Sequence, residues 1–432
     1  MNNCTPEELI NNLSFCVIDL ETTGGNHNKD KIIEIGMIKI SNRKITDQKS
    51  FLINPEIPIP EFIQKLTNIS QKSVKDAQII ENVIDSIIEF IGDDIIVAHN
   101  TSFDVPFLNG VLRRLEKPEL ENKVICTNVM TKHLIPEILN SNLNYMSRLF
   151  NIDHSKAHRA HDDALATAKL LIIYLNIFIE KGIKKVNQLY YPRNKFELDR
   201  THLDNNLSNE EVIKYIQQKE RSLLVTLKGE RGLILAVIPI ETPNEEIEIV
   251  KYALNNLDWK IITIKLIKPL IQGVLQFNNH YFKYPEHIRE RLLNYLNERY
   301  GVPEDQRKSL DKFDFVISHH LIRDQVIVYN FLHLNTNTKN IFKIPAQKKK
   351  LHQFLARQIS RFETNQKGQK KLLIHNDLVP LVESFLTRNT EGSKFLILNR
   401  KHIKEDKDGT LKHIEGFANE DSNHFNFPTK HL

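Results

Sequence analysis

One helical segment constrains the fold of this 432-residue chain more than any other part of the sequence. Residues 159–179 are rich in alanine and leucine, and apolar side chains occur on every side of the helix that this stretch predicts. A helix that is apolar all round has to be buried among other elements. Asp163, near its start, would lie on a packed side, where a carboxylate without a partner is costly. The segment therefore predicts a deep core with an acidic group inside it.

The residues before this helix alternate between strand-like and helix-like segments. Short apolar runs predict strands, and longer runs with helical spacing predict helices. Strands mixed with helices in this way favour a three-layer α/β domain. The expected strands are 15–18, 32–40, 51–53, 95–98 and 124–126, and the expected helices are 79–91 and 105–115.

The length of the chain favours at least two domains. We expect a first domain at 1–183, a linker at 184–207, an α+β domain at 208–400 and a polar tail at 401–432. Ser208 followed by Glu211 resembles a capping box that opens a new helix. The motifs of the second half do not indicate any known family. Its expected strands are 223–227, 233–238, 261–267, 325–334, 371–375 and 395–398, and its expected helices are 245–257, 288–296 and 351–362.

The composition is that of an ordinary globular protein with a mildly basic balance. The formal charge is +5, with 41% hydrophobic residues. This charge is compatible with a nucleic-acid partner but does not establish one. The three cysteines Cys4, Cys16 and Cys126 form no CxxC pair, which excludes a disulfide framework and a cysteine zinc site. No apolar run approaches the roughly 20 residues of a membrane span, so we expect a cytoplasmic protein without a membrane partner.

Two acidic residues end the first apolar strand. Asp19 and Glu21 are spaced i, i+2, so both side chains project to the same face of the strand. Hydrolysis of a phosphodiester needs an activated water and positive charge near the attacking and leaving oxygens, which two divalent metal ions supply when carboxylates hold them. An acidic pair alone is more often a solvated strand end, but a tight turn, TTGG, follows this one.

Two further blocks carry acidic residues. Asp104 begins a helix after the strand 95–98, where a carboxylate is ordinarily a capping or first-turn residue, and His99, Asn100 and Phe103 precede it. Asp163 follows His158 by five positions, a spacing that suits a metal-ligating carboxylate and a histidine that can take a proton from water.

These blocks, in this order, resemble the DEDDh exonucleases, the family that includes the proofreading (epsilon) subunit of bacterial replicative DNA polymerase. The resemblance covers residues 13–180. The sequences that carry it are DLETTG from Asp19, IIEIGMIKI from Ile32, LTNIS from Leu66, AHNTSFDVPFL from Ala98 and HRAHDDALAT from His158.

The resemblance implies a ribonuclease-H-like fold with a central mixed sheet and a metal-dependent 3′→5′ exonuclease activity. Asp19, Glu21, Asp104 and Asp163 would hold two Mg²⁺ or Mn²⁺ ions. His158 would be the general base, and nucleoside monophosphates would be released. The residues expected to contact the substrate strand or shape the site are Leu20, Thr22, Thr23, His99, Asn100 and Phe103.

Two features depart from the family pattern or offer an alternative to it. Asn68 stands where relatives often carry glycine, near the position that approaches the terminal base, which puts base contacts in doubt. The third block also contains His154, His161 and Asp162, and His161-Asp162 is typical of HD phosphohydrolases too. That class needs further His and Asp residues on other helices, which we cannot place. We prefer the pair His158 and Asp163 because the four residues between them match the spacing of the family.

Several functional alternatives remain open at this level. The expected partner is a nucleic acid with a 3′ end, and the resemblance favours DNA, in proofreading or repair, over RNA. RNA exonucleases share the same five residues, and a module that only binds nucleic-acid ends is the alternative from another class.

QLYY at 188–191 loosely resembles a sliding-clamp-binding peptide, so a replicative polymerase or clamp is a possible partner. Basic residues at 348–361 beside an apolar helix face could hold a phosphate backbone.

Overall fold

The chain forms two compact units whose boundary falls between Glu197 and Leu198. The computed structural model describes residues 9–155, 157–185, 188–189, 197–332, 340–364, 374–390 and 395–420. Among these described residues, no helix combines the length and the apolar composition that crossing a membrane requires.

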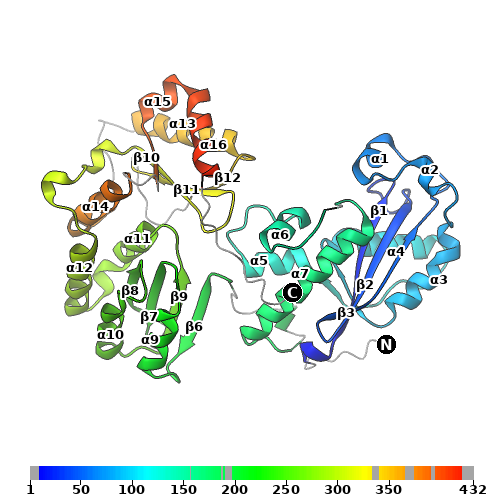
Figure 1. Cartoon of the computed structure of the whole chain (residues 1–432), viewed down its shortest axis with the longest axis horizontal. Helices are drawn as coiled ribbons and strands as arrows, with labels where there is room; N and C mark the ends of the chain where they lie inside the picture. Colours follow the sequence, from blue (N-terminus) through cyan, green and yellow to red (C-terminus); the bar gives the residue numbers. More distant parts are fainter. Residues whose placement is uncertain are drawn as a thin grey trace. The chain divides into compact units, whose positions relative to one another are not determined.

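The first unit is built on a five-stranded mixed sheet (Figure 1). Its strand order is β3-β2-β1-β4-β5. β1 pairs antiparallel with β2 and parallel with β4, and β5 continues the parallel side. This arrangement confirms the central mixed sheet that the sequence predicts. The strands are β1 Ser14–Thr22, β2 Ile32–Ser41, β3 Lys44–Leu52, β4 Ile95–Ala98 and β5 Val124–Cys126.

Helices cover both faces of this sheet. On one face, α3 and α4 share a hydrophobic core with β1, to which the strand contributes Cys16, Ile18 and Leu20. On the other face, α7 packs along β1 and β2, and its length and burial confirm the deeply packed helix expected from its composition. The helices are α1 Glu61–Thr67, α2 Gln71–Val74, α3 Ile80–Ile91, α4 Thr101–Arg114, α5 Thr127–Leu134, α6 Leu143–Leu149 and α7 Ala160–Glu180.

A glycine lets the first turn of α7 rest directly on the sheet. Gly36 lies in β2 opposite Asp19 of β1. A Cβ atom added at Gly36 would lie 2.2 Å from the carbonyl oxygen of Ala160 and 2.5 Å from the backbone nitrogen of His161. Side chains cannot approach backbone atoms so closely, so only glycine permits this contact.

A buried acid fixes the same helix start. Glu34, two residues before Gly36, is only 4% exposed. Its carboxylate accepts hydrogen bonds from Arg159 Nε at 3.1 Å and Nη2 at 2.6 Å, and from the backbone nitrogen of Ala160 at 2.9 Å. A forked arginine contact of this kind is strong and directional. Charge pairing and close backbone packing together therefore hold the beginning of α7 against β2.

The second unit contains two antiparallel four-stranded sheets, with orders β6-β9-β7-β8 and β12-β11-β10-β13. One hydrophobic core joins the first sheet to a face of the second, and a smaller core covers the other face of the second sheet. Antiparallel sheets with separate helices confirm the expected α+β class. The strands are β6 Arg200–Asp204, β7 Leu223–Lys228, β8 Ile234–Ile240, β9 Ile261–Leu266, β10 Phe315–His319, β11 Gln325–Asn330, β12 Asn340–Lys343 and β13 Phe395–Leu398.

The helices of this unit pack on both sheets (Figure 1). The expected capping box is present, because Ser208 Oγ accepts from the backbone of Glu211 and the Glu211 carboxylate accepts from the backbone of Ser208. The helices are α9 Asn209–Gln217, α10 Ile247–Asn256, α11 Ile271–His280, α12 Glu286–Tyr300, α13 Lys348–Thr364, α14 Val379–Thr390, α15 Arg400–Glu405 and α16 Lys407–Asn419.

The structure differs from the expected linker and tail. Part of the segment expected as linker forms β6, which pairs with β9 along its whole length. Within the segment expected as a polar tail, α16 buries Ile414 and Phe417 in the smaller core. Both elements expose polar residues on one side and bury few side chains, so their sequences resemble loops. Residues 371–373 of one expected strand lie outside the described residues.

Replacing Gly36 tests the packing of α7 on the sheet. We expect Gly36→Ala to destabilise the first unit, because the added methyl group forces Ala160 away from β2. Overpacking of this kind costs about 1–3 kcal/mol, which lowers the melting temperature by roughly 2–12 °C for a unit of this size. Gly25→Ala is the matched control, because no atom lies within 4 Å of a Cβ at that position. Equal thermal stability of both variants, measured by circular dichroism, would contradict this account.

We propose that the first unit folds independently and that its end lies near Glu197 rather than at residue 183. Residues after 183 contact the rest of the unit: Lys184 accepts a hydrogen bond from the backbone of Ile10 at 2.8 Å, and Glu197 accepts one from Lys181 Nζ at 2.7 Å. We expect a fragment of residues 1–197 to unfold cooperatively on heating and a fragment of residues 1–183 to be less stable. An unfolded 1–197 fragment would refute the proposal.

Candidate active site

The end of β1 carries two of the expected acidic residues. Alternate residues of the strand face the α3/α4 core, so Asp19 and Glu21 project to the opposite side, where α7 lies. The register of the sheet places Asp19 opposite Gly36 and Glu21 opposite Glu34. The residues that hold the start of α7 are thus the strand partners of the two acids.

Asp104 approaches from the first turn of α4 and is 4% exposed. The cap of this helix is Asn100, and Asp104 does not serve as the cap. The Asp104 carboxylate instead accepts hydrogen bonds from the backbone of Leu20 and from its own backbone. The acid is therefore tied to β1, beside Asp19 and Glu21.

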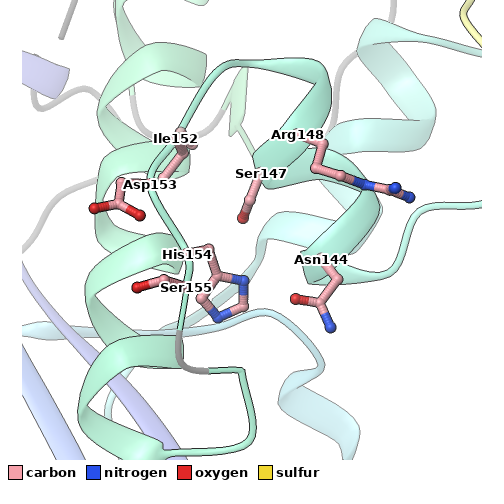
Figure 2. Close-up of a pocket in the computed structure, with 7 residues that line it drawn as sticks. All are labelled: Asn144, Ser147, Arg148, Ile152, Asp153, His154 and Ser155. Carbon is pink, nitrogen blue, oxygen red and sulfur yellow. The ribbon is translucent and has the colours of Figure 1, made fainter.

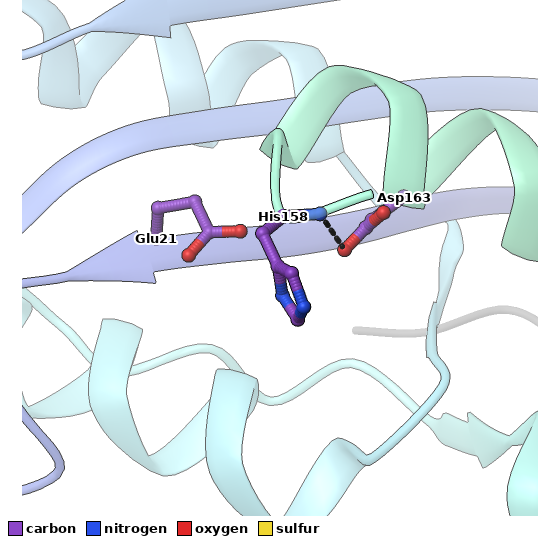
Figure 3. Close-up of side chains that lie close together, drawn as sticks. All are labelled: Glu21, His158 and Asp163. Atoms are coloured by element: carbon purple, nitrogen blue, oxygen red, sulfur yellow. Dashed lines mark hydrogen bonds between the residues drawn. The ribbon is translucent and has the colours of Figure 1, made fainter. Parts of the chain in front are cut away.

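The third block brings His158 and Asp163 to the same place. Atoms of Glu21, His158 and Asp163 that could bind a metal ion all lie within 4.8 Å of one another (Figure 3). The backbone nitrogen of His158 also donates to Asp163 Oδ2 at 3.3 Å. His158 has a left-handed backbone, with φ of 65°, a conformation that non-glycine residues adopt at a cost and that often occurs at functional sites.

The acids raise one another's pKa values. Burial raises the pKa of Asp19 well above its usual range, and the charges of Asp104, Asp163 and Glu21 raise it further. The pKa of Glu21 rises to about 8, first through burial and then through Asp163 and Glu34. That of Asp104 rises to about 7 through burial. A set of buried oxygen ligands that repel one another fits hard divalent cations, which prefer carboxylates.

The residues expected to shape the site lie around this cluster. His99 uses both ring nitrogens, with Nδ1 3.0 Å from Thr127 Oγ1 and Nε2 2.7 Å from the carbonyl oxygen of Ser141. Burial lowers the pKa of His99. Asn100 accepts from Ser102 Oγ at 2.8 Å. His99 therefore connects the end of β4 to α5 and to the segment before α6.

The other expected contact residues are largely buried. Phe103 packs on the α3/α4 core and against Phe107, with 5.6 Å between ring centroids. Leu20 is 6% exposed. The hydroxyl of Thr22 donates to the carbonyl oxygen of Gly24 at 2.7 Å, and that of Thr23 accepts from the backbone of Lys31 at 3.0 Å. The hydroxyl groups of Thr22 and Thr23 stabilise the turn after β1. Contact of Leu20, Thr22, Thr23 and Phe103 with a substrate remains a prediction.

Sequence reasoning missed two roles in this region. Glu34 and Gly36 interrupt an apolar strand, and glycine inside a strand is a known signal of close backbone approach. His154 was one of several unassigned histidines, and its Nε2 hydrogen-bonds Asp163 Oδ1. Asn68, which departs from the family pattern, ends α1 in a left-handed conformation with φ of 56°. Asparagine tolerates this conformation better than most residues, which explains why it can stand where glycine is common.

Comparisons with known proteins assign this region to a family. Residues 16–171 match the exonuclease family model RNase_T. The DNA polymerase III PolC-type of Caldanaerobacter subterraneus subsp. tengcongensis is 41% identical over 175 residues, which are 40% of this chain and 12% of that protein. The 3′-5′ exonuclease DinG of Staphylococcus epidermidis is 32% identical over 190 residues, 44% of this chain and 21% of that protein.

A solved structure of exonuclease X in complex with 5′ overhanging duplex DNA is 30% identical, covers 38% of this chain and 91% of that one, and has a TM-score of 0.32. The chain spans 12% and 21% of the lengths of the PolC-type and DinG relatives. Residues 16–171 thus match an exonuclease domain, in agreement with the motifs of this region.

Proposed function

We propose that the chain is a metal-dependent 3′→5′ exonuclease that acts on DNA, in proofreading or repair, and releases nucleoside monophosphates. The observation that carries this proposal is the convergence of Glu21, His158 and Asp163 within 4.8 Å, next to Asp19 and the buried Asp104. A module that only binds nucleic-acid ends would not need this complete set of acids and a histidine.

Asp19, Glu21, Asp104 and Asp163 would hold two Mg²⁺ or Mn²⁺ ions. When bound, such ions supply positive charge that favours hydroxide over water and offsets the charge of the phosphate. The raised pKa values of Asp19, Glu21 and Asp104 support this assignment, because four close carboxylates need compensating charge to stay ionised together.

His158 would act as the general base. The water oxygen bonds to the terminal phosphorus, and the bond from that phosphorus to the 3′ oxygen of the preceding nucleotide breaks. His158 takes the proton from the attacking water, and the leaving 3′ oxygen gains a proton from solvent. The contacts of Glu34 with Arg159 and Ala160 restrain the backbone next to His158, which keeps the ring near Glu21.

The choice of DNA rests on the relatives, whose names include DNA polymerase III. RNA is the alternative substrate for the same chemistry, because the 2′-hydroxyl that distinguishes RNA is recognised outside the hydrolytic groups. A polymerase or sliding clamp as partner, and a cytoplasmic location, also belong to this proposal. Tyr190 and Tyr191 of the clamp-like peptide lie outside the described residues. Phosphate binding by the second unit is a further part of the proposal. Its basis is a set of exposed basic side chains on α13, namely Lys349, Lys350, Arg357 and Arg361.

Strand degradation tests this function directly. We expect shortening of single-stranded DNA from its 3′ end with Mn²⁺ and none with EDTA, measured on 3′-labelled and 5′-labelled DNA and RNA. His158→Ala should lower the rate by about 10²–10⁴-fold through loss of the base, and Asp163→Ala should remove most activity. Asp162→Ala is the matched control for Asp163→Ala, because it removes the adjacent acid, which is not one of the proposed metal ligands, and it should leave most activity in place. Cleavage of RNA alone would move the function to RNA processing, and near-normal rates of Asp163→Ala would refute the assignment.

The pH dependence of stability tests the metal site. Glu21 has an ordinary pKa of 4.5 and a folded-state pKa of about 8. Between these values the folded state binds more protons than the unfolded state, so stability in EDTA should fall as pH rises. Mg²⁺ should raise the melting temperature more at pH 8 than at pH 6, because it binds the ionised acids.

Glu21→Gln should reduce both the pH dependence in EDTA and the effect of Mg²⁺. The matched control is Glu61→Gln, which changes an exposed acid on α1. A melting temperature that rises with pH in EDTA, or an equal effect of Mg²⁺ at both pH values, would contradict the raised pKa that burial and the neighbouring acids give Glu21.

A further inference from the structure

His154 contacts an acid of the active site from outside the cluster of ligands. It lies between α6 and α7, and its side chain is only 4% exposed. Its Nε2 hydrogen-bonds Asp163 Oδ1. Because a carboxylate can only accept, Nε2 carries the proton and donates it.

Both carboxylate oxygens of Asp163 are engaged by the segment that precedes α7. Oδ1 accepts from the ring of His154, and Oδ2 accepts from the backbone nitrogen of His158 at 3.3 Å. A carboxylate has about four lone-pair positions. The two hydrogen bonds therefore leave lone pairs on the Asp163 oxygens that can bind a cation. The atoms of Asp163 and Glu21 that could bind a metal ion remain within 4.8 Å of each other. The two donors therefore set the rotation of the Asp163 carboxylate and leave it able to bind a cation.

His154 also lines a pocket of about 480 Å³ (Figure 2). His154 Nδ1 is buried and has no hydrogen-bond partner among the described residues, and the same holds for Ser147 Oγ. The same side chain thus lines the pocket and hydrogen-bonds Asp163. The residues that line the pocket are Asn144, Ser147, Arg148, Ile152, Asp153, His154 and Ser155.

We propose that His154 is a positioning residue, which orients Asp163 for divalent-metal binding without itself contacting the metal or the substrate. Groups that hydrogen-bond a metal ligand from behind commonly fix its orientation, and their loss weakens metal binding. His154 differs from His158 in geometry, because the ring of His158 lies with Glu21 and Asp163 while Nε2 of His154 is already bonded to Asp163. This inference rests on the proposed metal-dependent function.

The test measures Mn²⁺ binding by the full chain through loss of the free-ion EPR signal. We expect His154→Gly to weaken binding by about 10–100-fold. In His154→Gln the amide N–H can reach the same carboxylate oxygen, so binding should stay within a few-fold of the original chain. His161→Gly is the matched control on α7, because the His161 ring lies 3.3 Å from Gln48 Oε1 and, among the described residues, forms no hydrogen bond with Asp163.

Imidazole in solution gives a second, independent measurement. Removal of the side chain in His154→Gly would open the pocket toward Asp163, so added imidazole can occupy the place of the ring. We expect imidazole to restore most of the Mn²⁺ affinity of this variant and to leave that of the original chain unchanged. In the double variant His154→Gly with Asp163→Ala, imidazole should have no effect, because the acceptor is missing.

The outcomes separate this inference from the function on which it depends. If the original chain binds no Mn²⁺, both the metal-dependent function and the inference fail. If it binds Mn²⁺ and folded His154→Gly binds equally well, only the inference fails. Loss of turnover at saturating Mn²⁺ with unchanged Mn²⁺ affinity would overturn positioning and give His154 a direct catalytic role. Circular dichroism of each variant verifies that it is folded.

Discussion

The contact between the start of α7 and strand β2 is the constraint on which the active site depends. Gly36 allows the backbone of Ala160 to lie against the sheet, and Glu34 binds Arg159 and the backbone of Ala160. Helix α7 brings Asp163, and the turn before it brings His158. Because Gly36 and Glu34 are the strand partners of Asp19 and Glu21, one short stretch of β-sheet sets the separation between acids that are far apart in sequence.

This arrangement concentrates negative charge in a place where burial makes it costly. Asp19, Glu21 and Asp104 all have raised pKa values, and burial is the largest cause for each. Glu34, though close to them, is compensated by the guanidinium of Arg159. Glu34 stabilises the fold through a cation of the chain. Among the described residues no lysine or arginine forms an ion pair with the other three acids, which suits them to a cation from solution.

Much of the first unit could be predicted from the sequence, because four of its five strands are apolar runs and its acidic residues occur in recognisable motifs. β3 is largely polar and exposed, so only its end was expected as a strand. The roles of Gly36 and Glu34 could not, since they depend on strand pairing and on a contact with residues more than 120 positions away. The role of His154 depends on its rotamer and not on its spacing. In the second unit, β6 is not predicted from the sequence because four of its five residues are polar, as in a linker, and its strand form depends on pairing with β9.

The chemistry proposed for this chain is local to one unit, which fits the occurrence of similar segments in different proteins. Every acid and histidine of the proposed site lies between β1 and α7, within residues 19–163. The relatives contain this region as 12% of a PolC-type polymerase and 21% of a DinG exonuclease. The second unit has hydrophobic cores of its own, so its fold does not depend on the catalytic sheet. It supplies none of the groups proposed for hydrolysis, so the proposed chemistry rests on the first unit alone.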